Sequence, residues 1–269
     1  MKYLVFLACF VLGTAQAQVN KPPAPRHAFT VIAHRGDHVI CPENTLAAYN
    51  EAIKNEVDYV EIDLRTTKDG HLVSMHDATV DRMTEGKGKI SDLTLAEIEA
   101  LHVKSNDSTD KTVYRVPTFE EILTLCKGKI YIYIDYKKAD VAQTFSMLKS
   151  FGMEKQVLVY INYPQQFVDW RKIAPAMPLM VSKPENIKDE PALNTYVDKV
   201  KPDILDGGWD EYTPQLVAAA KLLNLVVWPD IQGKNEAADW NSALAKGFNG
   251  LQTDHPADLI KFLKEKGLR

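Results

Sequence analysis

The feature that most constrains the fold is a repeated alternation, from residue 30 onward, of short β-rich segments with longer segments of helical spacing. Repeated strand–helix units indicate a parallel sheet. The expected strands are residues 30–34, 59–64, 72–76, 130–136, 157–161, 179–182, 203–205, 226–228 and 250–253. The expected helices are residues 46–54, 140–150, 164–173, 190–199, 214–223, 235–245 and 256–266. In a chain of 269 residues, this number of units predicts a closed (β/α)₈ barrel, the TIM barrel.

The second and third expected strands explain why nine are found where such a barrel has eight. A short segment with a turn at Lys68-Asp69-Gly70 separates them, so no crossover helix fits and an antiparallel hairpin is predicted. A turn centred there places Asp63 roughly opposite Met75. His76 therefore returns beside Glu61 and Asp63.

Residues 77–117 carry little barrel pattern and are polar, with a short helical segment at 94–101. They are interpreted as a small insertion after the second-strand hairpin. Insertions on the loops that follow barrel strands lie at the catalytic face. The predicted domain is therefore residues 29–269, with 77–117 as an insertion over one end of the barrel.

The first residues have the pattern of a targeting segment. Lys2 precedes an apolar run from Tyr3 to Leu12, and Ala15-Gln16-Ala17 is a small-residue cleavage signal. Residues 1–17 are thus predicted to be a Sec signal peptide, with export to the periplasm or the medium. The run is too short for a stable membrane anchor, and cleavage with lipidation at Cys9 is the weaker alternative. Residues 18–28, which contain Pro22-Pro23-Ala24-Pro25, are expected to form an extended tether.

Composition excludes several classes of protein. With 45% hydrophobic and 25% charged residues, the chain is neither disordered nor a membrane bundle. The net charge of -4 argues against a nucleic-acid partner, so an anionic substrate has to be bound by a local site. After signal cleavage, Cys41 and Cys126 remain, and two free buried thiols are favoured over a disulfide. Nothing in the sequence specifies an oligomeric state.

Three carboxylates end two of the expected strands. Glu61 and Asp63 lie two residues apart on one strand, so both side chains share a face. Two inward carboxylates repel each other unless a cation or a proton lies between them. Asp135 ends the apolar run Ile130–Ile134, where a charge without a partner is costly. One Mg²⁺ or Ca²⁺ ion would suit such oxygen ligands, whereas the alternative is an exposed strand with ordinary acids.

Two histidines end strands at the same predicted mouth. His34 is followed by Arg35, whose planar fork can bind phosphate oxygens, and by Gly36, which allows a sharp turn or a close approach. A histidine titrates near neutral pH, as a general acid or base should. Taken singly, His34 and His76 are each more typical of a hydrogen-bonded structural residue. Their shared position favours catalysis.

These motifs together resemble the glycerophosphodiester phosphodiesterases, a family of TIM barrels with a small insertion after the second histidine. The matching segments are V-I-A-H-R-G, P-E-N-T at 42–45, V-E-I-D-L-R-T-T-K-D-G-H-L-V-S-M-H-D at 60–77, I-D-Y-K at 134–137 and Q-T-D-H-P at 252–256. The resemblance covers almost the whole mature chain. It implies hydrolysis of glycerophosphodiesters to glycerol 3-phosphate and an alcohol, in the breakdown of glycerophospholipids.

The resemblance also implies roles for individual residues. His34 and His76 match the acid–base pair of the family. The implied metal ligands are Glu61, Asp63 and Asp135. Residues implied near the phosphate, the glycerol or the leaving group are Arg35, Lys137 and Trp228. For Trp228, a core aromatic at a strand end is an equal alternative.

Three residues depart from the family pattern and bear on substrate range. Asp135 stands where a glutamate is usual and is one methylene shorter. Asp37 follows H-R-G and is expected to add negative charge near the mouth. Pro229 follows Trp228 where threonine is common. The alternatives are therefore a phosphodiesterase for a lysophospholipid, an inositol phosphodiester or a wall polymer, or a non-catalytic protein that binds phosphoesters.

Overall fold

The computed structural model describes residues 19–269, so the expected signal peptide at 1–17 lies outside the described residues. Nine parallel-paired strands follow the order β8-β7-β6-β5-β4-β2-β1-β10-β9, and β3 pairs antiparallel with β2. The strands are β1 Thr30–Ala33, β2 Tyr59–Thr66, β3 Leu72–Ser74, β4 Tyr131–Lys138, β5 Val157–Ile161, β6 Leu179–Ser182, β7 Ile204–Asp206, β8 Val226–Val227, β9 Asp230–Ile231 and β10 Gly250–Thr253.

The barrel is closed by β8 and β9, which are two halves of one barrel strand. They are separated only by Trp228 and Pro229, and proline has no backbone N–H for a ladder. β8 pairs with β7, and β9 pairs with β10. Across the interruption, the Trp228 amide donates to the Leu205 carbonyl at 3.0 Å and the Gln252 amide donates to the Pro229 carbonyl at 3.0 Å. The predicted (β/α)₈ barrel is thus confirmed.

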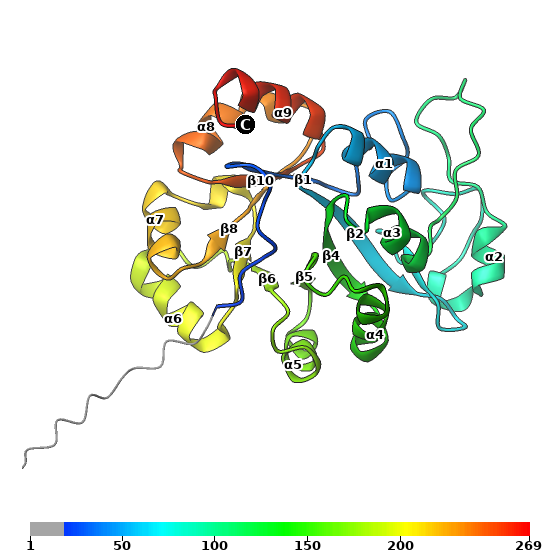
Figure 1. The fold of residues 1–269 in the computed structure, drawn as a ribbon, viewed down its shortest axis with the longest axis horizontal. Helices are drawn as coiled ribbons and strands as arrows, with labels where there is room; N and C mark the ends of the chain where they lie inside the picture. The colour runs from blue at the N-terminus through cyan, green and yellow to red at the C-terminus, as the bar shows by residue number, and fades with distance from the viewer. Residues whose placement is uncertain (1–18) are drawn as a thin grey trace, which may run out of the picture.

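Helices cover the outside of the barrel (Figure 1). They are α1 Leu46–Lys54, α3 Phe119–Cys126, α4 Val141–Phe151, α5 Pro164–Ile173, α6 Glu190–Val200, α7 Pro214–Leu222, α8 Trp240–Ala245 and α9 Pro256–Glu265, with a short α2 at Leu95–Glu99. The expected helix at 235–245 is split into a 3₁₀ turn, Glu236–Ala238, and α8.

Helix α3 was not expected, although the sequence carries its signal. Thr118 and Glu121 form a capping box, in which each side chain bonds the other residue's backbone N–H. Buried Phe119, Ile122 and Cys126 then recur at helical spacing. A Thr-x-x-Glu pattern before a periodic apolar run is the sequence mark of a helix start.

The side chains inside the barrel change from apolar to polar toward the carboxyl ends of the strands. A layer of buried apolar and aromatic residues fills its middle: Ile32, Tyr59, Tyr133, Leu158, Met180, Ile204 and Trp228. Inward side chains recur every second residue on a strand. The next inward positions toward the carboxyl ends are polar, among them His34, Glu61, Asp135 and Asp206. The apolar layer therefore forms the floor of a polar site at the carboxyl ends.

The hairpin has the predicted register. Leu64 pairs with Ser74, and the Met75 amide donates to the Asp63 carbonyl at 2.9 Å. Beyond it, residues 77–117 form a lobe next to the hairpin, drawn in cyan to green in Figure 1. This lobe has a separate hydrophobic cluster that includes Val80, Ile98 and Val103. The same cluster includes Val73 and Met75, so the insertion packs directly on the hairpin.

Residues 19–28 are not a free tether. They run across the amino end of the barrel, as the blue segment in Figure 1 shows, and the Asn20 amide donates to Asp203 Oδ1 at 2.7 Å. The Tyr59 hydroxyl donates to the Pro23 carbonyl, and the His27 ring bonds Asp58 at 2.7 Å. The proline-rich segment therefore packs against the barrel end opposite the polar site.

The described part of the chain contains the cysteines Cys41 and Cys126. Within residues 19–269, Cys41 and Cys126 are free thiols, as predicted. Only Cys126 is buried, because Cys41 lies in the half-buried loop between β1 and α1 rather than in a barrel element. None of the helices in the described part of the chain has the length and apolar character needed to cross a bilayer.

Candidate active site

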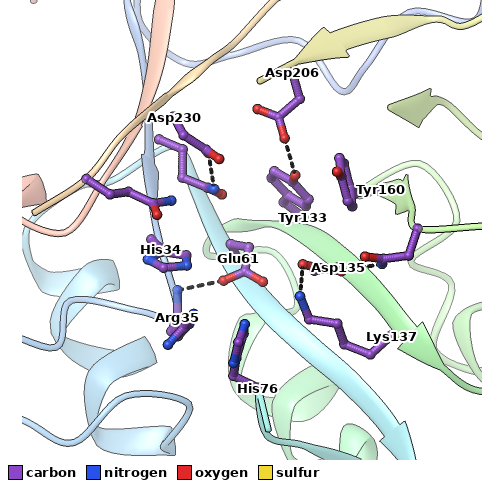
Figure 2. Close-up of a pocket in the computed structure, with 13 residues that line it drawn as sticks. His34, Arg35, Glu61, His76, Tyr133, Asp135, Lys137, Tyr160, Asp206 and Asp230 are labelled. Carbon is purple, nitrogen blue, oxygen red and sulfur yellow. Dashed lines mark hydrogen bonds and ion pairs between the residues drawn. The ribbon is translucent and has the colours of Figure 1, made fainter. Parts of the chain in front are cut away.

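A polar cavity of about 220 Å³ opens at the carboxyl ends of the strands (Figure 2). The barrel strands end at this cavity, and the active sites of TIM barrels form at the carboxyl ends of their strands. The cavity is lined by His34, Arg35, Glu61, His76, Tyr133, Asp135, Lys137, Tyr160, Asn162, Asp206, Asp230, Gln232 and Gln252. Both histidines, both cations and two of the three expected metal ligands are therefore in one cavity.

The three expected ligands do meet. Adjacent parallel strands β2 and β4 place Asp63 directly beside Asp135, and Glu61 lies one inward position earlier on β2. Each of the three residues offers a carboxylate oxygen, and these oxygens lie within 4.8 Å of one another. Glu61 and Asp63 are 2% and 1% exposed. The cluster is thus a buried, all-oxygen donor set.

The three carboxylates of this cluster face two cations, Lys137 and Arg35, whose Nε lies 3.6 Å from Asp63 Oδ2. Burial raises the pKa of Glu61 well above its usual range, and the neighbouring Asp63 and Asp135 raise it further. Burial and Asp63 likewise raise the pKa of Asp135. Lys137 Nζ lies 2.5 Å from Asp135 and 3.3 Å from Asp63. Asp63 Oδ1 still has no hydrogen-bond donor among the described residues. A hard divalent cation therefore fits this donor set.

The turns after β1 hold these carboxylates in place. The Arg35 amide donates to Glu61 Oε2 at 2.7 Å from a left-handed backbone conformation, with φ of 53°. Asn44, from the P-E-N-T segment, donates to Asp63 Oδ2 at 2.7 Å. The side-chain Oδ1 of Asn44 accepts hydrogen bonds from the Tyr49 and Ser74 hydroxyls at 2.9 and 2.8 Å. Thr45 caps helix α1, so the Asn44 side chain supports Asp63 and does not cap the helix.

Gly36 is required by the same turn. Its φ is 85°, which side chains disfavour, and an added Cβ would lie 2.8 Å from the Ala48 Cβ. The H-R-G turn thus packs directly onto helix α1. The positive φ bears out the sharp turn expected at Gly36, and its close approach is to helix α1.

His34 is held by the carboxylate of Asp254. Its Nδ1 lies 2.7 Å from Asp254 Oδ1, and the Gly233 amide donates to the other Asp254 oxygen at 3.0 Å. The cap position of helix α9 is the next residue, His255. Burial lowers the pKa of His34. The ring is therefore oriented through Nδ1, and its Nε2 is the nitrogen left for proton transfer.

His76 has a carboxylate of its own. Its Nδ1 lies 2.8 Å from Asp77 Oδ1, and Arg82 Nε donates to Asp77 Oδ2 at 2.7 Å. The same guanidinium donates to Glu43 Oε1 at 2.7 Å, and Glu43 also accepts from Arg35 at 3.0 Å. Arg82, from the lobe, thus links the support of His76 to the support of Arg35.

We expect Arg82→Gln to lower kcat by about tenfold, about 1.4 kcal/mol, because Asp77 and Glu43 lose the cation that aligns them. Steady-state kinetics and thermal unfolding would be measured together. Arg115→Gln is the matched control, since Arg115 is an exposed arginine of the same lobe that bonds only the Glu99 carbonyl. Equal kinetics for Arg82→Gln and Arg115→Gln would remove Arg82 from the site.

Two expectations about the pocket are corrected. Trp228 is 1% exposed and packs 5.2 Å, centroid to centroid, from Tyr59 in the apolar layer, so it does not line the cavity. Trp228 is therefore a core aromatic residue, which was the alternative expectation. Asp37 does not charge the mouth either, because it is buried and accepts a hydrogen bond from Asn55 at 2.8 Å.

Other polar and aromatic side chains line the cavity beside the expected site residues. Asn162 donates to Asp135 Oδ1 at 2.7 Å. The signal for these residues is their position at or near strand ends. They are Tyr133, Tyr160, Asn162, Asp206, Asp230, Gln232 and Gln252.

Comparison with known proteins matches most of the chain to one family. Residues 34–258 match the family model described as the glycerophosphoryl diester phosphodiesterase family. A glycerophosphodiester phosphodiesterase of Caldanaerobacter subterraneus is 30% identical over 246 residues, covering 88% of this chain and 98% of that protein. A glycerophosphodiester phosphodiesterase of Bacillus subtilis is 28% identical over 287 residues, covering 97% and 95%.

Solved structures share the fold. A phosphodiesterase from Oleispira antarctica, solved in complex with the product sn-glycerol-3-phosphate, has a TM-score of 0.77 at 22% identity, covering 87% of this chain and 96% of that one. A glycerophosphodiester phosphodiesterase from Agrobacterium tumefaciens has a TM-score of 0.74 at 23% identity, covering 85% and 98%. By fold, site and sequence, the chain belongs to the glycerophosphodiester phosphodiesterase family and is an enzyme of that class.

Proposed function

We propose that the chain hydrolyses glycerophosphodiesters to glycerol 3-phosphate and a free alcohol, with one divalent cation and with His34 and His76 as its acid–base pair. The observation that carries this proposal is the arrangement of the two histidines. Each is held by its own carboxylate, and both line the cavity that contains the metal-type cluster. The solved Oleispira relative binds the product that this reaction would release.

The charged groups of the cavity divide between phosphate and metal. Arg35 and Lys137 line the cavity and would bind the phosphate oxygens, since both offer N–H donors to an anion. Glu61, Asp63 and Asp135 would hold the cation. When bound, Mg²⁺ or Ca²⁺ supplies charge that stabilises the phosphate oxygens during reaction.

The two histidines would move the protons. One removes a proton from the nucleophile, which is either water or the neighbouring glycerol hydroxyl, and the other donates a proton to the leaving alcohol. With the hydroxyl as nucleophile the first product is a cyclic phosphate, and water then opens its ring to give glycerol 3-phosphate. The lowered pKa of His34 favours its neutral form at pH 7 and hence the accepting role. His76, with a more exposed side chain, would then protonate the leaving group at the mouth.

A panel of substrates tests this function. We expect the purified enzyme to release both glycerol 3-phosphate and the alcohol from glycerophosphocholine, glycerophosphoethanolamine and glycerophosphoinositol. Both products would be quantified in each reaction. Release from lysophosphatidylcholine or a wall teichoic polymer, with none from the three glycerophosphodiesters, would replace the proposal by one of its alternatives. Binding without turnover of any member would indicate a non-catalytic phosphoester-binding protein.

The proposed reaction serves the breakdown of glycerophospholipids outside the cytoplasm. The support is the signal-peptide pattern of residues 1–17, with cleavage expected before Gln18. Amino-terminal sequencing of protein from the periplasm and the medium would check this. Detection of the uncleaved chain in the cytoplasmic fraction alone would contradict export.

A further inference from the structure

Glu236 is a buried glutamate that lies close to the active site without lining its cavity. It begins the 3₁₀ turn Glu236–Ala238, which follows β9, and only 4% of the residue is exposed. Within residues 19–269, it belongs neither to the cavity lining nor to the carboxylate cluster. The chemistry proposed above therefore gives this carboxyl group no part.

One oxygen of Glu236 holds the carboxyl end of β10. Glu236 Oε1 accepts a hydrogen bond from the Thr253 hydroxyl at 2.5 Å and another from the His255 backbone amide at 2.8 Å. These two donors belong to the residues on either side of Asp254. Because the preceding residue, Gln252, lines the cavity, alternation along the strand turns the Thr253 side chain outward. Glu236 therefore holds this strand end from outside the barrel.

Asp254 lies just past the part of β10 that the sheet fixes. The ladders of β10 with β1 and β9 both end at Thr253. The side-chain oxygens of Asp254 bond His34 Nδ1 at 2.7 Å and the Gly233 amide at 3.0 Å. Since the ladder stops one residue earlier, the backbone around Asp254 is held by the two bonds that Glu236 makes to its neighbours.

The same strand end holds His34 at two points. The His34 amide donates to the Thr253 carbonyl at 3.1 Å, and the His34 ring bonds the Asp254 carboxylate. A shift of this strand end would therefore move both the backbone and the ring of His34. Misplacement of a reacting group by about 1 Å can lower a rate by about 100-fold.

Glu236 can act through Oε1 in either protonation state. Burial raises the pKa of Glu236 to about 7, although the bonds from Thr253 and His255 oppose this rise. Its other oxygen, Oε2, is buried and has no hydrogen-bond partner in the described part of the chain. An ionised and a protonated carboxyl group both keep Oε1 as an acceptor, and so does the amide of glutamine. Glutamine at position 236 should thus preserve both bonds, whereas alanine removes them.

We propose that Glu236 is a positioning residue, which fixes the Asp254 carboxylate so that it orients His34 for proton transfer. It acts through the two residues that flank Asp254. This proposal rests on the acid–base role proposed above for His34. Because Glu236 lines no part of the cavity, its loss should lower kcat and leave KM almost unchanged.

The first test compares Glu236→Ala and Glu236→Gln with the unchanged enzyme on glycerophosphocholine, below the Tm of each protein. We expect alanine to lower kcat by about 10- to 100-fold, as does the loss of a partner that orients a metal-bound histidine. KM should change by less than about twofold, because binding contacts remain. Glutamine should keep at least about a third of kcat, since Oε1 still accepts both bonds.

Two results of this comparison would reject the proposal. One is an alanine variant with the kcat of the unchanged enzyme, because the strand end would then not need Glu236. The other is a glutamine variant as slow as the alanine variant, because the two bonds to Oε1 would then not be what matters.

Asp203→Ala is the matched control for the loss of a buried acid. Asp203 is 2% exposed and accepts the Leu179 and Asn20 amides at 2.9 and 2.7 Å, at the amino end of the barrel. Both alanine variants should have a lower Tm, but only Glu236→Ala should have a lower kcat while folded. An equal fall in kcat would assign the effect of Glu236 to a general loss of stability. Should Asp203→Ala not fold, glutamine against alanine at position 236 still decides the question.

A double-mutant cycle tests the path through Asp254. If Glu236 acts only by placing that carboxylate, Glu236→Ala should lower kcat by less than about twofold in an enzyme that already carries Asp254→Asn. Losses that add in full would mean that Glu236 acts by another path, and would overturn the assignment. These results differ from failure of the proposed function, in which the unchanged enzyme would hydrolyse no glycerophosphodiester or a folded His34→Ala variant would keep its activity.

Discussion

His34→Ala is expected to lower kcat on glycerophosphocholine by about 10²- to 10⁴-fold, the range that a positioned acid or base contributes. The reason is that alanine removes the ring nitrogen that exchanges a proton at the cavity, while Asp254 remains without a partner to orient. The fold should persist, because His34 lies at the end of β1 above the apolar layer. Steady-state kinetics and circular dichroism would be measured on the same preparation.

His102→Ala is the control for this substitution. His102 is an exposed histidine of the lobe. Its backbone amide donates to Glu85 Oε1 at 2.9 Å, and its ring Nδ1 lies 3.8 Å from the same oxygen. Its activity should match that of the unchanged enzyme. Retention of more than a tenth of the activity by a folded His34→Ala variant would sink the acid–base role of His34.

Chelation with EDTA is expected to reduce activity to background, and addition of Mg²⁺ or Ca²⁺ to restore it. The cluster joins three carboxylates, two of them buried and two with raised pKa values, and it is faced by two cations, Arg35 and Lys137. For the same reason the cation should stabilise the fold. At a hundred times its dissociation constant it would contribute about 2.7 kcal/mol, or a Tm increase of about 5–10 °C for a domain of this size.

Asp63→Asn separates the ion from other effects of chelation. Asp63 is the ligand whose Oδ1 receives no hydrogen bond within the described residues, and asparagine keeps its shape. The variant should lose most of the metal-dependent rise in Tm as well as the activity. Full activity after complete metal removal, verified by elemental analysis, would count against any role of a cation.

The alternation of strands and helices was enough to predict the barrel, because each inward strand face and each amphipathic helix leaves a periodic pattern. The hairpin was equally local. A turn centred at Asp69 pairs residues that lie at equal distances before and after it. The Met75–Asp63 hydrogen bond has that register. Helix α3 was missed although its capping box, Thr118 to Glu121, was present.

Contacts between residues distant in sequence could not be predicted in the same way. The partner of His34 is 220 positions away at Asp254, and Arg82 reaches back 39 positions to Glu43. No periodic pattern in the sequence indicates which strand ends lie next to one another in the folded barrel. Trp228 shows the same limit, because its family position suggested a pocket residue and its packing on Tyr59 places it in the core.

The sequence by itself determined the barrel, the hairpin, and the histidines, cations and metal-type carboxylates expected at its mouth, since these follow from local periodicity and from motifs at strand ends. Only the tertiary structure decided which carboxylate orients each histidine, which aromatic residue is core, and that Asp206, Asp230 and Gln252 line the same cavity. The physical reason is closure of the barrel. Burial and charge interactions at the mouth depend on side chains from strands that become neighbours only when the sheet closes.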